Sequence, residues 1–306
     1  MNLHRSSGRA GLGLGLALLT ALVWGSLPVA LKILIRHLDP LTVTWARFLV
    51  AGLLLLVSGA GRLRPGTWRV GWLWVVLLLA ATVGMCGNYA FYVLGLAHTT
   101  PTTAQLVIQL SPLFLMAGSL VIFGERFGPR QWLGFAVLLA GLGAYFSDRI
   151  GELLAGWEGL GGGVLLIFAA ALSWAVYALS QKQLLSRFHP TFVLLVIYLG
   201  GALLLWPLAR PAGLLEQPPA RLALLAATAL VTLISYRSFA GALEHLEGSR
   251  VSLVISLTPL VTMVATAATA PLWPEHIQAD PRRWVSLLGA LLVVGGSMLT
   301  ALGRRR

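Results

Sequence analysis

The chain has few charged residues and very few acidic ones. Only 10% of its 306 residues are charged, and ten of these are Asp or Glu, whereas a soluble domain carries roughly 25% charged residues. From Val70 to Gly124 there is no Asp, Glu, Lys or Arg. Because 58% of the residues are hydrophobic and the mean hydropathy is +0.84, this scarcity of charge argues against a soluble protein and predicts a chain that lies within a membrane.

Sequence patterns that carry enzyme chemistry are also lacking. All ten acidic residues fall at the ends of apolar runs or between them. Proton-driven antiporters commonly use a buried carboxylate as the proton relay, and no apolar run of this sequence contains one. Paired carboxylates, metal-ligand spacings and nucleophile–base spacings are not found, which argues against an intramembrane enzyme. Cys86 is the single cysteine, so no intramolecular disulfide forms. We predict neither a cofactor nor a metal site.

Apolar runs between charged residues predict ten membrane spans. Backbone amides in lipid must find their partners within their own segment, so each span is expected to be a helix. The first run is too long for the apolar core of a signal peptide and is taken as the first span. The expected spans are 11–32, 41–60, 70–95, 101–123, 130–147, 160–181, 190–209, 220–243, 250–273 and 284–302.

The second half of the chain repeats the first about 150 positions later. Matched pairs include Trp24–Trp174, Lys32–Lys182, Tyr89–Tyr236, Pro112–Pro259 and Gly134–Gly289. Each copy holds five spans, and an odd number inverts the second copy in the membrane. We therefore predict an all-α integral membrane protein of ten transmembrane helices in two inverted five-helix repeats, 1–150 and 151–306.

Basic residues are distributed unequally between the two sides. With a cytoplasmic N-terminus, 13 of the 22 Lys and Arg residues lie inside and 6 outside. This bias predicts a multi-pass protein of the plasma (inner) membrane with both termini in the cytoplasm. The net charge of +12 is then mostly a signal of topology, because no soluble domain exists to present a face to nucleic acid. The expected partners are membrane lipid and a small-molecule substrate, bound by a monomer.

Short motifs follow the same order in both halves. The first half carries Trp24-Gly25-Ser26, Arg47, Leu110-Ser111-Pro112 and Gly124-Glu125-Arg126-Phe127, and the second carries Ser249-Arg250-Val251-Ser252, Leu257-Thr258-Pro259 and Pro274-Glu275-His276. Over nearly the whole chain they resemble the EamA-like branch of the drug/metabolite transporter superfamily. The resemblance implies export or exchange of small metabolites, amino acids among them, and leaves the substrate open.

Polar and aromatic side chains within the spans are the candidate site, because each is costly in lipid. Gln105, Gln109 and Pro112 share one helix face, and their repeat mates are Ser252, Ser256 and Pro259. They line a substrate path or serve as interhelical hydrogen-bonding groups. The aromatic residues bind solute or form the interfacial belt. The predicted substrate-binding set is Trp24, Asn88, Tyr89, Tyr92, Gln105, Gln109, Trp174, Tyr177, Tyr236, Arg237 and Ser256.

The remaining cations and the glycines complete the prediction. Lys32 and Lys182 attract a substrate carboxylate or snorkel to the headgroups, and Arg237 clamps an anion or snorkels likewise. The resemblance implies a structural anchor at Arg47. The fifth and tenth spans have almost no polar groups and carry glycines, which suits close packing. These are Gly134, Gly141, Gly289 and Gly296.

Together these features predict a secondary transporter that exports or exchanges amino-acid-like amphipathic solutes by alternating access. A carrier for phosphorylated or nucleotide-linked solutes is an alternative that would need several cations in the cavity. A membrane-embedded enzyme or a lipid-handling scaffold is the alternative from another class.

Overall fold

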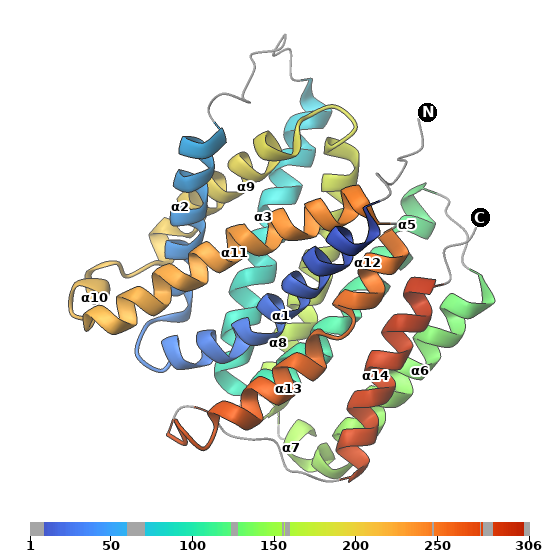
Figure 1. The fold of residues 1–306 in the computed structure, drawn as a ribbon. Coiled ribbons are helices and arrows are strands. Elements are labelled where there is room, and N and C mark those ends of the chain that lie inside the picture. Colours follow the sequence, from blue (N-terminus) through green and yellow to red (C-terminus); the bar gives the residue numbers. More distant parts are fainter. Residues whose placement is uncertain are drawn as a thin grey trace.

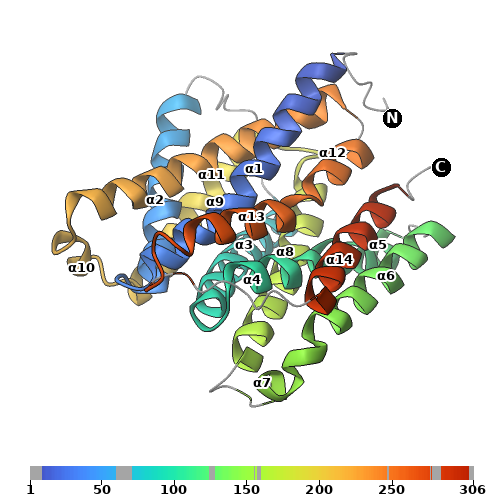
Figure 2. The same cartoon turned by 60° about the horizontal axis from the view of Figure 1, so that its bottom comes forward.

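The structure is a computed structural model that describes residues 9–59, 71–123, 128–154, 156, 160–246, 248–275, 277 and 284–302, and all regular elements in these ranges are helical. Figures 1 and 2 show the helices gathered in one bundle. The first repeat contains α1 (Ala10–Leu34), α2 (Pro40–Gly59), α3 (Trp72–His98), α4 (Pro101–Val107), η2 (Ile108–Leu110), α5 (Ser111–Phe123) and α6 (Pro129–Phe146).

The second repeat has the same order of helices. It contains α8 (Leu160–Leu184), α9 (Pro190–Leu205), α11 (Pro219–His245), α12 (Gly248–Ile255), α13 (Thr258–Thr269) and α14 (Trp284–Leu302). Four short elements lie in the connections: η3 (Ser147–Arg149), α7 (Ile150–Leu154), η5 (Trp206–Leu208) and α10 (Ala212–Leu215).

These helices confirm the predicted all-α membrane architecture. In the described ranges, nine helical stretches are long and apolar enough to cross a membrane, and Trp284–Thr300 is a shorter apolar helix. The predicted ends fall within a few residues of the observed ones. The Gly124–Phe127 motif and His276 lie outside the described residues.

Local sequence accounts for several helix ends. Proline occupies the first position of α2, α4, α6, α9 and α11, where its missing N–H costs nothing and its fixed φ suits a helix. At α4, the Thr100 side chain accepts a hydrogen bond from the Thr103 backbone N–H. At the C-terminal end of α3, the Lys32 Nζ donates to the carbonyls of Leu96 at 2.6 Å and Thr99 at 2.7 Å.

The fourth span of each repeat is interrupted at the same place. The 3-10 turn η2 separates α4 from α5 just before Pro112, and a turn at Ser256 and Leu257 separates α12 from α13 just before Pro259. Proline cannot donate to the carbonyl four residues earlier, and its ring clashes with that carbonyl. These carbonyls belong to Ile108 and Ile255, where the regular α-helices stop. The sequence prediction treated both spans as continuous, so the interruptions are a finding of the structure.

Repeat mates run antiparallel where they touch. A Cβ built on Gly134 would meet the Gly296 carbonyl oxygen at 2.7 Å, and one built on Gly141 would meet the Gly289 carbonyl oxygen at 2.8 Å. The lower-numbered glycine of α6 thus meets the higher-numbered glycine of α14, as antiparallel helices require. This pairing is what inverted repeats produce, and it confirms the predicted close packing of the fifth and tenth spans. The two helices lie side by side in Figure 1.

Contacts between the repeats position the site. Helix α1 packs along α11, and α3 packs along α8; these two contacts are equivalent under the repeat, because α8 is the mate of α1 and α11 is the mate of α3. Each repeat therefore places its first helix against the third helix of the other. The interface that results contains a cavity whose wall is built from both repeats.

The glycine contact between α6 and α14 gives a first prediction. Gly141→Ala should destabilise the protein by about 1–3 kcal/mol, because the new methyl group overpacks a backbone contact. Gly143→Ala is the matched control, since nothing lies within 4 Å of a Cβ at Gly143 and alanine is the better helix former. Thermal unfolding of the detergent-purified variants measures the difference. Equal melting temperatures for the two variants would contradict the close contact.

Candidate functional site

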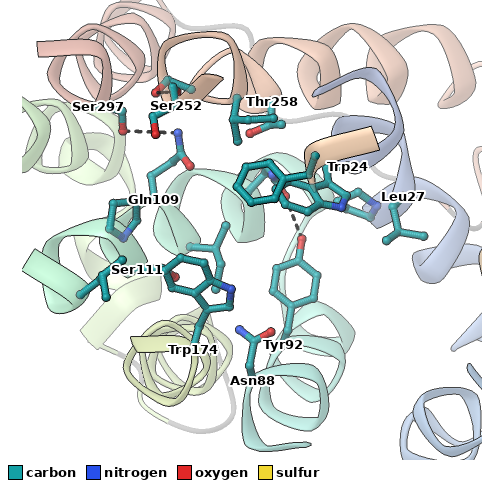
Figure 3. A pocket seen from close by; sticks show the side chains of 18 of the residues that line it. Trp24, Leu27, Asn88, Tyr92, Gln109, Ser111, Trp174, Ser252, Thr258 and Ser297 are labelled. Carbon is teal, nitrogen blue, oxygen red and sulfur yellow. Dashed lines mark hydrogen bonds between the residues drawn. The ribbon is translucent and has the colours of Figure 1, made fainter. Parts of the chain in front are cut away.

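Both repeats line a cavity of about 490 Å³. Its wall is a mixture of aromatic rings, amides, hydroxyls and aliphatic side chains, with Arg47 the single charged residue among the described lining residues. The broken spans border it directly, since Ile108, Gln109, Ser111 and Pro112 lie in its wall, as do Ile255, Ser256 and Thr258. Figure 3 shows side chains from both repeats converging on this space.

The structure brings most of the predicted site residues together. Nine of them line the cavity: Trp24, Asn88, Tyr89, Tyr92, Gln105, Gln109, Trp174, Tyr236 and Ser256. The stripe on the fourth span faces the cavity, as Gln105, Gln109 and Pro112 all contribute to the wall. Of their mates, Ser252 and Ser256 line the cavity and Pro259 is buried outside it.

Two predicted residues lie away from the cavity wall. Tyr177 belongs to the face of α8 that packs on α3, where a Cβ on Gly84 would meet the Tyr177 nitrogen at 2.7 Å. Arg237 is exposed on α11 and its Nη2 donates to the Ser58 hydroxyl of α2 at 3.1 Å. Three positions along a helix rotate a side chain by about 60°, which is enough to turn Tyr177 away from the cavity that Trp174 faces.

The structure adds polar residues that the sequence prediction missed. The expectation that the fifth and tenth spans bring almost no polar groups was wrong, because Gln131 on α6 and Ser297 and Thr300 on α14 line the cavity. Their signal in the sequence was that of any polar residue in an apolar run. The other polar lining residues outside the predicted set are Arg47, Ser111, Ser119, Ser252 and Thr258.

Hydrogen bonds hold the amide side chains and leave part of each amide available. The Tyr92 hydroxyl donates to Gln105 Oε1 at 3.1 Å, Gln109 Nε2 donates to the Ser297 hydroxyl at 3.3 Å, and Asn88 Nδ2 donates to the Ala170 carbonyl at 3.0 Å. Figure 3 draws the first two bonds. An amide has both donor and acceptor atoms, so these bonds do not use the NH₂ group of Gln105 or the side-chain oxygens of Gln109 and Asn88.

Aromatic rings form another part of the wall. Trp24 lies 5.7 Å from Tyr236 in an edge-to-face arrangement and 5.5 Å from Phe239, measured between ring centroids. Trp174 faces the cavity from α8. Rings of this kind offer a flat apolar surface together with a polar N–H or O–H group. The cavity therefore presents both apolar and hydrogen-bonding surfaces, as an amphipathic solute needs.

The two repeat-related lysines lie in different environments. Lys32 is 7% exposed and its ammonium group is hydrogen bonded to three backbone carbonyls at the end of α3, those of Leu96, Ala97 and Thr99. It is held there as a helix cap and does not line the cavity. Lys182 is exposed on α8. In the described part of the chain, no group of His, Cys, Asp and Glu side chains is placed to hold a metal ion.

Comparison with known proteins places this architecture in a family. The model of the EamA-like transporter family matches the chain twice, over residues 11–146 and 161–302. The chain is 33% identical to the uncharacterized inner membrane transporter YhbE of Escherichia coli (strain K12), covering 97% of this chain and 93% of that protein. It is 34% identical to an uncharacterized transporter of Haemophilus influenzae, covering 96% of each chain.

More distant matches agree in length. A probable amino-acid metabolite efflux pump of Salmonella typhimurium is 26% identical, with 95% of each chain covered. One solved crystal structure superposes with a TM-score of 0.64 at 20% identity, covering 97% of this chain and 100% of the other. At this identity the superposition supports the fold alone.

The cavity wall yields a second prediction. Trp174→Ala should lower solute flux by roughly 30-fold, as truncating an aromatic anchor in a binding pocket does, and Gln109→Ala by about 3- to 10-fold, through loss of a hydrogen bond. Trp72→Ala is the matched control, because Trp72 is 78% exposed at the start of α3. Flux into proteoliposomes that contain equal amounts of inserted protein is the measurement. Normal flux in both cavity variants would exclude this wall as the binding site.

Proposed function

The chain belongs to the EamA-like transporter family, and on that premise we propose that it exports or exchanges small amphipathic metabolites, amino acids among them, by alternating access. Its relative YhbE is named as an inner membrane transporter, and the chain is a multi-pass membrane transporter rather than an enzyme. The observation that carries the finer proposal is the cavity of about 490 Å³ shared by both repeats. A volume of this size suits a small metabolite.

The cavity wall supports an amino-acid-like solute. Amides, hydroxyls and one guanidinium group supply hydrogen bonds for polar ends, and Trp24, Trp174 and Tyr236 supply apolar surface for a side chain. The name of the Salmonella relative, a probable amino-acid metabolite efflux pump, points the same way. A phosphorylated or nucleotide-linked solute is less well served, since Arg47 is the one cationic side chain among the described lining residues and such solutes carry two or more negative charges.

The fold supports alternating access as the mechanism. Inverted repeats pair about an axis in the membrane plane, and the substrate site lies between them near the midplane. Interrupted spans belong to this arrangement, because irregular backbone is tolerated at membrane depth where it lines a cavity. The breaks before Pro112 and Pro259 do line it. Since both repeats of one chain line the cavity, we also propose a monomer as the transporting unit.

The third prediction concerns coupling to protons. No Asp or Glu lies among the described residues of the cavity wall, so a buried carboxylate relay is not available there. Efflux of phenylalanine from proteoliposomes should change by less than about twofold when an imposed proton gradient is collapsed, because proton uptake is not part of the cycle. Strict dependence on that gradient, abolished by replacing one acidic residue, would contradict the proposal.

The fourth prediction concerns orientation. We propose that both termini are cytoplasmic, on the strength of the excess of basic residues in the segments assigned to that side. In a Cys86→Ala background, Gly11→Cys should react with an impermeant maleimide only after cells are permeabilised, and Gly151→Cys should react in intact cells. Neither site hinders the new side chain, because nothing lies within 4 Å of a Cβ at Gly11 or Gly151. The reverse labelling pattern would show that the orientation is inverted.

A further inference from the structure

Arg47 is buried in the bundle, and no acidic side chain among the described residues pairs with it. Its side chain is 2% exposed, yet it forms part of the cavity wall. The ion pair between Arg149 and Glu152 lies outside the cavity. Desolvating a guanidinium group costs several kcal/mol unless a partner compensates. The protein therefore holds an unneutralised positive charge beside its binding cavity.

Its hydrogen bonding is also incomplete. A guanidinium group has five N–H donors. Nη2 donates to the Thr232 hydroxyl at 2.8 Å, and Nε is buried without a hydrogen-bond partner in the described part of the chain. Thr232 in turn donates to the Thr228 carbonyl at 2.8 Å, which fixes its oxygen as the acceptor. One hydrogen bond to a neutral hydroxyl offsets little of the desolvation cost of a buried guanidinium group. An anion would supply the acceptors that its remaining N–H groups need.

Neighbouring aromatic rings hold the guanidinium group in place. Its central carbon lies 4.9 Å from the Tyr89 ring centroid, a cation–π distance. The Tyr89 ring packs edge-to-face on Phe48 at 5.0 Å, and Phe48 packs on Tyr198 at 5.4 Å. This wall fixes the position of Arg47 from α3 and α9 without neutralising its charge. A cation held by rings and a hydroxyl remains electrostatically available to a ligand.

The charge is present on one side of the pseudo-symmetric cavity only. The repeat mate of Arg47 is Ile197, which is fully buried and apolar. The lining amides share this asymmetry, because Asn88, Gln105, Gln109 and Gln131 all belong to the first repeat. Hydroxyls come from both repeats, from Ser111 and Ser119 in the first and from Ser252, Ser256, Thr258, Ser297 and Thr300 in the second. The charge and the amides therefore lie on one side of a pseudo-symmetric cavity. This difference between the two sides orients a solute with one anionic end.

From this geometry we infer that Arg47 binds the carboxylate of the transported solute and selects monocarboxylates, including zwitterionic amino acids, over their uncharged or cationic analogues. The inference rests on the proposed function and names the substrate class of the same cavity. The carboxylate lies at the α2 side of the cavity against Arg47, and the apolar part of the solute extends toward the rings of Trp24 and Trp174. Thr232 and Tyr89 are positioning residues for the guanidinium group.

The fifth prediction tests this inference by binding, without relying on flux. The probes are 3-phenylpropionate and 3-phenylpropionamide, which differ only in carboxylate against carboxamide. Thermal unfolding of the detergent-purified full-length protein is followed with each probe, because a ligand of the folded state raises the melting temperature. The wild type should be stabilised by the acid at concentrations about 10- to 100-fold lower than by the amide, the factor expected for a charged hydrogen-bonding partner.

Variants separate selectivity from folding. Arg47→Met should lose the preference for the acid and keep the weak effect of the amide, whereas Arg47→Lys should keep a reduced preference because it retains the charge. Arg36→Met is the matched control, as Arg36 is exposed beyond α1, and it should keep the full preference. An equal response of the wild type to the two probes overturns the inference. This comparison uses the wild type alone, so it is valid even where Arg47→Met does not fold. An Arg47→Met protein that folds and still prefers the acid overturns it as well.

Failure of the proposed function gives a different result. Phenylalanine and phenylalaninamide are supplied as transport probes to wild-type proteoliposomes. If neither is carried while the acid alone stabilises the protein, the proposed function fails and the role of Arg47 stands. If both are carried at equal rates and the acid and amide stabilise equally, transport stands and the role of Arg47 fails.

Discussion

The hydrocarbon interior of a bilayer offers no hydrogen bonds, and the structure follows from this constraint. Backbone groups must be paired within each segment, so the apolar runs form helices. Polar side chains must turn toward other helices, so the amides, hydroxyls and Arg47 gather at the interface of the repeats and form one cavity. The helix interruptions before Pro112 and Pro259 obey the same rule. Both lie at the cavity wall, where freed backbone carbonyls are shielded from lipid.

The sequence predicted the fold well because hydropathy and repetition are strong signals in a membrane protein. It also identified many residues of the cavity wall, since a polar residue such as Gln109 in the middle of an apolar run must face the bundle interior or a cavity to avoid lipid. What it could not supply was rotation about the helix axes. Tyr177 and Trp174 are three positions apart, and only the contact of α8 with Gly84 shows which one faces α3.

Two further differences between the sequence prediction and the structure have physical causes. Gln131 and Ser297 sit on helices whose glycines indicated close packing, and that packing is present; the prediction did not anticipate that the same helices also border the cavity. The resemblance to the transporter family implied that Arg47 is a structural anchor but did not identify its partners. The structure shows that Thr232 and Tyr89 hold it. Such partners depend on α3 and α11, which are distant from α2 in the sequence, so no local pattern predicts them.

The unneutralised charge of Arg47 also bears on which solutes the cavity refuses. A cationic solute about 7 Å from a fixed guanidinium group, at an effective dielectric constant of about 20, is repelled by about 2.4 kcal/mol, or roughly fiftyfold in affinity. No carboxylate among the described lining residues offsets this repulsion. Aromatic rings such as Trp24 would otherwise attract cations. In this cavity the fixed charge therefore opposes the preference of an aromatic wall for cations, and it favours the anionic end of a small metabolite.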